Sequence, residues 1–471
     1  MLNHVVENKK CIGCGACAFA FSDVLQMGMS TEGHWVPFAR NASGPSTEKT
    51  LSGLPKDAAR ICPMSGAGKD EDYIAEEKFP GIPKNDQIGK YLRTFAGCVT
   101  SENERAAAGS GGLITWLCKK LIVTQEVSAV VHVRPTYQEV EAGVLFEYAI
   151  SYTSDEVSDG AKSRYYPVEL SKVLSKIAES DDNYAVVGLP CTIKALKLLE
   201  YEGYIAPGQI KYTIGLVCGH LKSKYFSEYL AYQIGGNPSK TYYADFRHKF
   251  YNEPASYYGF RSEETDSDNS MASPMKALSG HDWGEGLFKN PACEFCDDVL
   301  AECADICLGD AWLPSYVNDW RGHNIGVVRS QKIASLLDSG EKEGRLSLTD
   351  VSVGQVIQSQ SAGLRHRREG LAHRLAVEES EASWVPKKRI SPKFAATRQR
   401  RKIYNLRYRI ALESSALYFM ATRRGNIAEF ETAIRPLLKK YRLASTGGLR
   451  SRLKRAVRRR LSKFLGGRKG S

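Results

Sequence analysis

Three cysteines near the N-terminus stand at a regular two-residue spacing. Cys11, Cys14 and Cys17 form a C-x2-C-x2-C run that can bring three thiolates to one small iron–sulfur cube, and the glycines between them permit the positive φ angles of such a loop. Cys62, followed by Pro63, is the candidate for the fourth ligand, because ferredoxin runs also end in Cys-Pro. A zinc site or a set of reduced structural thiols is the alternative, although three cysteines at this spacing are unusual for zinc.

A second group of cysteines lies further along the chain. Its members are Cys191, Cys218, Cys293, Cys296, Cys303 and Cys307. Cys293 and Cys296 form a C-x2-C pair, while Cys191 and Cys218 follow predicted strands whose ends meet at the ligand-binding edge of open α/β sheets. Spacing alone does not decide whether this edge or the two downstream cysteines complete a four-thiolate site. Each cysteine taken singly is compatible with an ordinary buried side chain.

A glycine-rich loop opens a predicted helix in the first half of the chain. Its N–H groups, together with the positive end of the helix, suit a phosphate or pyrophosphate. The candidate contacts are Arg105, Ser110, Gly111, Gly112 and Thr115. The loop matches neither the dinucleotide fingerprint G-x-G-x-x-G nor the P-loop, so a flexible turn before a core helix explains it equally well.

The elements that must position these residues follow an α/β pattern between about residues 90 and 219. Apolar, β-branched runs predict buried strands at Ala129–Val133, Tyr184–Gly188 and Tyr212–Cys218. Helical patterns lie between and around them, at Leu113–Val123, Leu170–Glu179 and Ile193–Glu200. The alternation favours a mainly parallel sheet with helices on its faces.

Length and composition set the wider frame. A chain of 471 residues favours two or three domains, and 42% hydrophobic residues allow a sizeable core. No apolar run is long enough for a membrane span, and the first residues lack the apolar core of a signal peptide. We therefore expect a cytoplasmic protein, in which clustered cysteines are more often metal or cluster ligands than disulfides.

Several of these motifs together resemble the beta subunit of coenzyme F-420 (deazaflavin) hydrogenases and dehydrogenases. The matching stretches are CIGCGAC, ICP, GSGGLITWL preceded by an arginine, GLPCTIKAL, IGLVCGH and CEFCDDVLAECADICLGDAW. They occur in the family's order and cover roughly residues 5–330. The family also includes a plant chlorophyll-cycle reductase and relatives from bacterial polysaccharide gene clusters.

The resemblance implies FAD and two 4Fe–4S clusters. It implies that the second cluster is held by Cys191, Cys218, Cys293 and Cys296, where the family's GxPC, GLxC and CxxC motifs fall. It places the flavin phosphates on the GSGG loop. It also places Asp305, Gly309 and Asp310 in a family signature. His220, Arg247 and Lys249, in polar stretches beside the motifs, are candidate substrate or flavin contacts, or else solvated surface residues.

The domain organisation that we expect has four parts, of which the resemblance implies the first three, with an α/β class overall. They are a ferredoxin-like cluster module at residues 1–80, an α/β flavin-binding domain at 88–220, a C-terminal domain completing the second cluster at 221–385, and a basic amphipathic tail at 386–471.

The basic tail is not part of the shared pattern, which makes a hydrogenase role doubtful for this chain. From Lys387 onward 26 Lys and Arg face 3 Asp and Glu, so the rest of the chain is acidic within a total of +12. Apolar residues every four positions from Leu449 to Leu465 predict a basic amphipathic helix. Such a helix favours the inner membrane surface or an acidic partner protein over nucleic acid, and a solvated tail is the remaining alternative.

The leading functional prediction is an iron–sulfur flavoprotein oxidoreductase that draws electrons from ferredoxin or another redox partner. Its substrate would be a small organic molecule, such as an intermediate of polysaccharide assembly, or a deazaflavin coenzyme. The alternative is a non-catalytic electron-transfer subunit of a larger redox complex. A zinc-stabilised nucleic-acid-binding protein is the third and weakest prediction.

Overall fold

The N-terminal part of the chain is a small module of short elements around a cysteine-bearing loop. The computed structural model describes residues 2–42, 44–45, 51, 54–55, 57–137, 143–265 and 270–446. The elements of the module are α1 (Leu2–Glu7), α2 (Ala16–Ala20), the antiparallel pair β1 (Leu25–Met29) and β2 (Trp35–Ala39), and the 3-10 helix η1 (Ala58–Ile61). Elements this short give almost no periodicity, which is why the sequence indicates only a compact cysteine-rich module.

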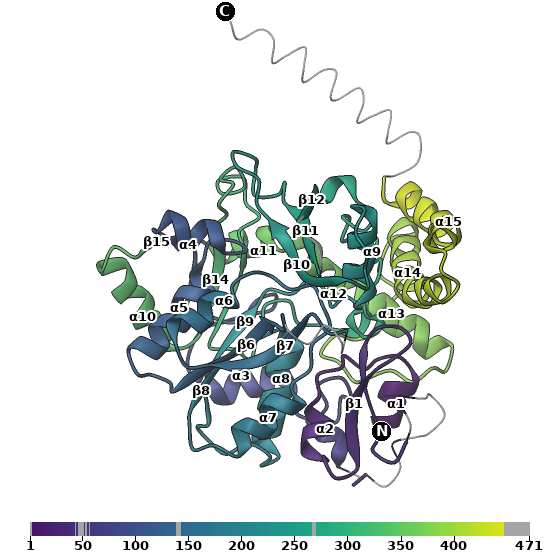
Figure 1. Cartoon of the computed structure of the whole chain (residues 1–471). Coiled ribbons are helices and arrows are strands. Elements are labelled where there is room, and N and C mark those ends of the chain that lie inside the picture. Colours follow the sequence, from purple (N-terminus) through teal and green to yellow (C-terminus); the bar gives the residue numbers. More distant parts are fainter. Residues whose placement is uncertain are drawn as a thin grey trace, which may run out of the picture.

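An eight-stranded sheet forms the centre of the molecule (Figure 1), in the order β15-β5-β14-β13-β9-β8-β6-β7. Its strands are β5 (Arg93–Val99), β6 (Ala129–Pro135), β7 (Phe146–Ser151), β8 (Tyr184–Gly188), β9 (Ile210–Leu216), β13 (Ile306–Asp310), β14 (Asn324–Val328) and β15 (Leu346–Asp350). The α/β class is confirmed, and the three predicted strands correspond to β6, β8 and β9.

The sheet is mixed rather than mainly parallel. β6, β8, β9 and β13 run parallel to one another, whereas β7, β14, β5 and β15 pair antiparallel with their neighbours. Parallel pairing needs a long crossover, usually a helix, and the connections from β6 to β7 and from β13 to β14 contain none in the described residues. β9 pairs with β13, so strands from residues 88–220 and from residues 221–385 belong to one sheet.

Helices cover both faces of this sheet. One face packs against α5 (Leu113–Val123), α6 (Ser154–Asp159) and α10 (Gln331–Lys342). The other packs against α3 (Glu71–Lys78), α7 (Ser171–Ala178), α8 (Pro190–Tyr201), α11 (Val353–Ser359) and α12 (Ser361–Arg367). Val130 joins the first core and its neighbour Val131 the second. This two-sided burial explains the continuous apolar runs that identified the strands.

A smaller sheet lies beside the central one. It contains β10 (Thr241–His248), β11 (Gly259–Glu264) and β12 (Met271–Pro274). Its core is shared with α9 (Tyr225–Gln233) and with a helical hairpin of α14 (Arg398–Arg423) and α15 (Ile427–Ser445). The remaining short elements are β3 (Lys84–Asn85), β4 (Gly89–Lys90), α4 (Glu102–Ala107), η3 (Met275–Ala277), η4 (Pro291–Phe295) and α13 (Glu369–Ser380).

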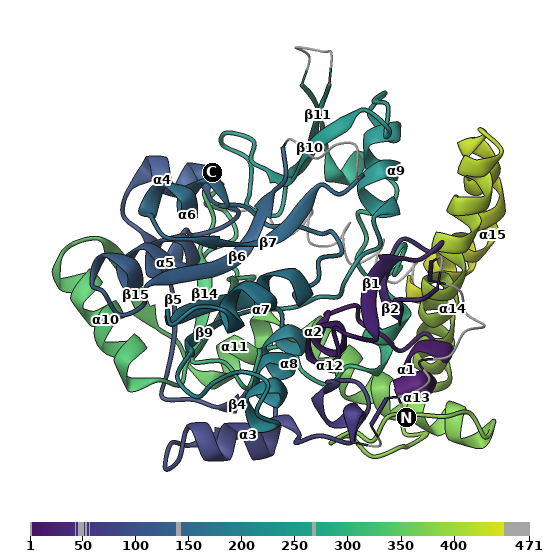
Figure 2. The same cartoon turned by 60° about the horizontal axis from the view of Figure 1, so that its bottom comes forward.

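The N-terminal module and the C-terminal helices lie side by side (Figure 2). Val5 and Met64 of the module share a core with Phe295 of η4 and with Leu371 and Leu375 of α13. Within the expected basic tail, α14 and α15 thus pack on the body, whereas the predicted stripe from Leu449 lies outside the described residues. None of the described helices is long and apolar enough to cross a membrane.

Candidate functional site

Cys11 and Cys14 lie on the tight loop between α1 and α2, and Cys17 lies in the first turn of α2. Gly13 and Gly15 adopt φ values of +69° and +83°, as the sequence predicts for such a loop. A Cβ on Gly13 would meet the Trp35 carbonyl oxygen at 2.4 Å, and one on Gly15 would meet the Leu170 backbone nitrogen at 2.9 Å. The loop therefore needs glycine at both positions for conformation and for packing.

Cys62 lies at the end of η1 and joins this loop. The Cys62 thiol raises the pKa values of Cys11 and Cys14, although burial is the larger cause in both. Burial and then the Cys14, Cys11 and Cys62 thiols raise the pKa of Cys17. Thiols that act on one another in this way lie close together, so the structure gathers the four cysteines that the sequence predicts as a set.

Each of these four sulfurs also faces a backbone N–H group. The N–H of Gly13 donates to the Cys11 sulfur at 3.4 Å, and N–H groups of Met64 and Ser65 lower the pKa of Cys62 against the larger, raising effect of burial. N–H groups of Ala16 and Ala18 act in the same way on Cys14 and Cys17. Such hydrogen bonds stabilise a thiolate and are one of the levers that set cluster potentials.

The second set is assembled from three parts of the fold. Cys191 lies in the first turn of α8, directly after β8, and Cys218 follows β9. Cys293 lies in η4, and Cys296 caps its C-terminal end. The parallel strands β8 and β9 end at the same edge of the sheet, which is what brings Cys191 and Cys218 together.

Electrostatics separate this set from Cys303, whereas the Cys218 thiol of the set is one of the weaker causes that raise the pKa of Cys307. Burial raises the pKa of Cys191, and the Cys218, Cys296 and Cys293 thiols raise it further. Cys303 is instead surrounded by Glu71, Asp298 and other charged groups, with no cysteine among the main causes of its raised pKa. The geometry supports the quartet that the resemblance implies, and the assignment of its members as cluster ligands stays a prediction.

The two sets are neighbours. The Cys14 thiol of the first set adds to the raised pKa of Cys191 in the second, and both thiols act on the buried Tyr148. The Leu170 N–H, at the start of α7, donates to the Cys14 carbonyl oxygen at 2.9 Å and fastens the first loop to the central domain. The arrangement places both sets within reach of one Tyr148 side chain.

The donor chemistry fits iron–sulfur clusters. Within the described residues, no group of three or more His, Cys, Asp or Glu side chains is arranged to hold a single metal ion. Cysteine thiolates are the usual ligands of iron–sulfur clusters, in which each thiolate binds its own iron. The N–H groups aimed at the first set and the Leu221 N–H at 3.2 Å from the Cys293 sulfur are suited to thiolate ligands.

Buried charges surround the second set. Glu294, which lies between Cys293 and Cys296, is fully buried. Its carboxylate is 2.6 Å from the Lys289 ammonium, 3.1 Å from Arg374 Nε and 3.1 Å from His366 Nε2. The Glu294 carboxylate therefore forms ion pairs with several cationic or potentially cationic groups in this part of the core.

The glycine-rich loop lies where β5 and β14 meet the start of α5. Gly112 has a φ of +85°, and a Cβ on Gly111 would meet the Asn324 backbone nitrogen at 2.8 Å. The Ser110 hydroxyl donates to the His323 carbonyl oxygen at 3.0 Å. Within the described residues, the N–H groups of residues 109–112 have no hydrogen-bond acceptor and the Thr115 hydroxyl has no partner. Free N–H groups before a helix are the feature that a phosphate site requires.

Arg105 has a supporting position rather than an open one. It is buried, and its guanidinium donates to the Gly322 carbonyl oxygen at 2.7 Å and pairs with Asp319 at 2.7 Å. Lys249 donates to the carbonyl oxygens of Arg105 and Ser110, and burial is the main cause that lowers its pKa to about 7. Both side chains support the loop through hydrogen bonds to backbone carbonyl oxygens and do not present a free charge to a ligand.

An aromatic cluster connects the second cysteine set to Arg247. The His220 ring lies 4.5 Å from that of Trp283, which lies 4.7 Å from that of Tyr165. Tyr165 interacts with Arg247, whose guanidinium pairs with Asp310 at 2.9 Å. The sequence suggested His220, Arg247 and Asp310 but missed Trp283 and Tyr165, because no fixed spacing links either residue to a motif.

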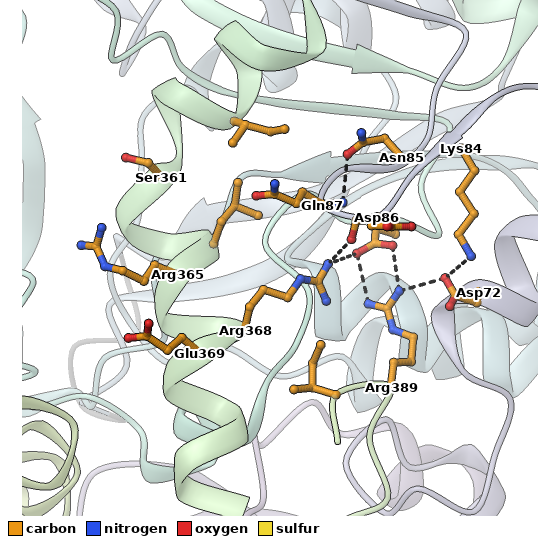
Figure 3. A pocket seen from close by; sticks show the side chains of 14 residues that line it. Asp72, Lys84, Asn85, Asp86, Gln87, Ser361, Arg365, Arg368, Glu369 and Arg389 are labelled. Carbon is orange, nitrogen blue, oxygen red and sulfur yellow. Dashed lines mark hydrogen bonds and ion pairs between the residues drawn. The ribbon is translucent and has the colours of Figure 1, made fainter. Parts of the chain in front are cut away.

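A charged pocket of about 520 Å³ lies between the 84–87 segment and α12 (Figure 3). Arg389 reaches Asp72 at 3.1 Å and Glu302 at 2.8 Å there, and Arg368 donates to the Asp86 carbonyl oxygen at 3.1 Å. The residues that the sequence predicts for cofactor binding do not line it. Its charges are largely paired, and we assign it no ligand.

Comparison with known proteins identifies one family in the chain. Two family models match it, and both are described as parts of the coenzyme F420 hydrogenase/dehydrogenase beta subunit. The model of the N-terminal part matches residues 94–175, and the model of the C-terminal part matches residues 181–354. A search of curated proteins finds no match.

A solved structure also aligns with the chain. It is a chain of the F420-reducing NiFe hydrogenase complex from Methanosarcina barkeri, studied by xenon derivatization, with 15% sequence identity and a TM-score of 0.48. The alignment covers 67% of this chain and 100% of that chain. The two family models together match more than half of the sequence. The chain belongs to the coenzyme F420 hydrogenase/dehydrogenase beta-subunit family.

Proposed function

We propose that this chain is an iron–sulfur flavoprotein oxidoreductase with two 4Fe–4S clusters and FAD. Family membership makes it a redox protein with an electron-transfer role; the flavin, the number of clusters and the substrate are the proposal. The observation that carries it is the pair of neighbouring thiol quartets that approach each other at Cys14 and Cys191. Neighbouring quartets are what single-electron transfer between two clusters needs.

The first cluster would be bound by Cys11, Cys14, Cys17 and Cys62, and the second by Cys191, Cys218, Cys293 and Cys296. In the first set the chain supplies backbone N–H donors to each sulfur, and its two glycines allow the tight turn of the loop. In the second, strand ends and η4 fix the four positions. The Leu170–Cys14 hydrogen bond keeps the two sets in a constant relation.

The flavin would be bound by two features of the chain. The unpaired N–H groups of residues 109–112 and the Thr115 hydroxyl support a phosphate site. The aromatic cluster from His220 through Trp283 and Tyr165 to Arg247 offers an aromatic surface and a cation beside the second cysteine set. Bound flavin would convert the single electrons of the clusters into a two-electron reduction.

The proposed electron donor is ferredoxin or another redox protein. The proposed acceptor is a small organic molecule, such as a sugar intermediate of polysaccharide assembly, or a deazaflavin coenzyme. A flavin near a cluster exchanges single electrons for the two-electron steps that such an acceptor requires.

Anaerobic purification of the full chain tests the proposal. We expect about eight iron atoms and a similar amount of acid-labile sulfide per chain, as two four-iron clusters require, together with one releasable flavin. Cys62→Ser and Cys191→Ser should each lose about half of the iron. Thr115→Val should retain less flavin with unchanged iron.

The matched control is Cys118→Ser, because Cys118 is a buried cysteine in α5 whose raised pKa is caused by burial and not by other thiols. Its iron content should equal that of the wild type. Colourless wild-type protein that contains zinc would refute the redox proposal. Turnover of an organic acceptor by the chain alone would support a complete enzyme, whereas cluster reduction without turnover would support an electron-transfer subunit.

A further inference from the structure

Arg367, the last residue of α12, is a cation buried beside the second cysteine set. Its side chain is 1% exposed. Its Nε and Nη1 atoms have no hydrogen-bond partner among the described residues. α12 lies beyond residue 354, where the family match ends, so the comparisons assign Arg367 no role. A buried guanidinium normally has a partner of opposite charge, which makes its surroundings informative.

The carboxylate in this part of the core is already shared. Glu294 serves Lys289, Arg374 and His366, and among the described residues no ion pair joins Arg367 to a carboxylate. The groups that face Arg367 are thiols: Cys296 and then Cys218 have the largest effect among the groups whose charge acts on it. Burial lowers the pKa of Arg367, but these thiols raise it above its usual value.

The cations near the first set are compensated by contrast. Lys194 pairs with Glu71 at 3.1 Å, and Lys388 lies 3.6 Å from Asp297. These are the two cations that act on Cys62. The first set therefore has neutralised cations around it, whereas the second has a guanidinium without a carboxylate partner.

With the proposed cluster sites as its basis, we infer that Arg367 is the fixed counter-cation of the cluster bound by the second cysteine set and makes it the more easily reduced of the two clusters. Reduction adds one electron and therefore one negative charge to the cluster. A positive charge in the low-dielectric interior stabilises the reduced state, and net charge and hydrogen bonds to sulfur are known determinants of cluster potential. A guanidinium does not lose its proton in proteins, so this contribution is permanent.

The consequence is a direction for electron flow. Electrons that enter at the first set move to the second set because the reduced state is more stable there. Arg367 acts through the sulfurs that it faces and does not contact substrate, so it is a positioning residue.

A redox titration followed by low-temperature electron paramagnetic resonance tests the inference on the full, anaerobically purified chain. In the wild type the second cluster should be reduced at a higher potential than the first, with Cys62→Ser used to assign the signals. Arg367→Met, which keeps the bulk and removes the charge, should shift the midpoint of the second cluster to more negative values and leave that of the first unchanged. Arg367→Lys should restore part of the shift.

Arg365→Met is the matched control, because Arg365 lies in the same turn of α12 but is exposed. It removes the same charge from a solvated position, so neither midpoint should move. Unchanged midpoints in Arg367→Met with full iron content would overturn the inference, and so would a wild type in which the first cluster is reduced first. The order in which the two clusters are reduced in the wild type tests the inference even if Arg367→Met fails to fold. A wild type without iron and sulfide would instead refute the proposed function.

Discussion

Buried polar side chains determine much of the local chemistry of this chain. Arg367 and Arg374 belong to a charged helical stretch, yet they are 1% and 2% exposed. A charged stretch in a sequence normally indicates a solvated surface, because long cationic side chains are seldom buried without partners. Their burial is explained only by the anionic groups that the fold brings to the same place, Glu294 and the second cysteine set.

His132 on β6 shows how such burial affects stability. Its Nε2 lies 2.8 Å from the hydroxyl of Ser151 on β7, and the ring is almost fully buried. Burial lowers the pKa of His132 to about 4, with Arg134 adding to the effect and Glu156 opposing it. The folded state thus binds this proton less readily than the unfolded state does.

We expect this difference to appear as acid destabilisation. The contribution of His132 is fully present above pH 6.5 and is lost as the pH falls toward 4, a change of about 3 kcal/mol in the free energy of unfolding. Denaturant unfolding at a series of pH values should show a shallower slope over this range for His132→Gln. His281→Gln is the control: His281 is exposed, so this variant should keep the wild-type dependence of the unfolding free energy on pH. The same pH dependence in His132→Gln and in the wild type would contradict the prediction.

At the level of elements, the helical hairpin α14–α15 is an integral part of the fold. Tyr418 of α14 is fully buried and packs against Tyr225, Phe288 and Phe430. Its partners come from α9, from the segment before η4 and from α15. Aromatic packing between segments so distant in sequence indicates that the hairpin stabilises the body.

Substitutions at Tyr418 test this role. Tyr418→Ala should lower the free energy of unfolding by about 3–5 kcal/mol, because it removes a large side chain from a packed core. Tyr418→Phe should cause no loss, since the phenol oxygen is buried without a hydrogen-bond partner in the described part of the chain. Chemical denaturation measures both changes. Met420→Ala is the control, because this side chain is 50% exposed. If Tyr418→Ala lowered the free energy of unfolding no more than Met420→Ala does, the hairpin would not stabilise the body.

For the whole molecule, charge is divided along the chain. Beyond residue 446 the sequence is rich in Lys and Arg and has no Asp or Glu, whereas the sequence before Lys387 is acidic overall. Each basic residue near an anionic bilayer contributes about 1 kcal/mol of attraction. The residues beyond 446 are therefore suited to an anionic surface, whereas residues 1–446, with 55 Lys and Arg against 53 Asp and Glu, carry little net charge.

Truncation after residue 446 tests this expectation. The full chain should sediment with vesicles containing phosphatidylserine, less so as salt rises, and not with neutral phosphatidylcholine vesicles. The truncated chain should lose this binding and keep its iron content and unfolding midpoint. Equal vesicle binding by both chains, or a clear preference of the full chain for duplex DNA, would contradict it.

The candidate ligands could be predicted from local sequence because a cluster loop is a local structure. Two-residue spacing and the glycines at 13 and 15 determine the geometry of the first loop, and the positive φ values confirm that use of glycine. The buried strands β6, β8 and β9 were equally evident, because burial on both faces requires continuous apolar runs. The mixed order of the sheet was not, since strand direction depends on connections that carry no periodic signal.

Sequence by itself determined the class of fold, the cysteine motifs and the uneven distribution of charge, because each depends on residues that are near one another in the chain. Only the tertiary structure decided that Cys14 approaches Cys191 and that Arg367 is buried without a carboxylate partner among the described residues. Those relations join segments that lie from tens of residues to more than a hundred residues apart. They arise from strand order and helix packing, which no local pattern specifies.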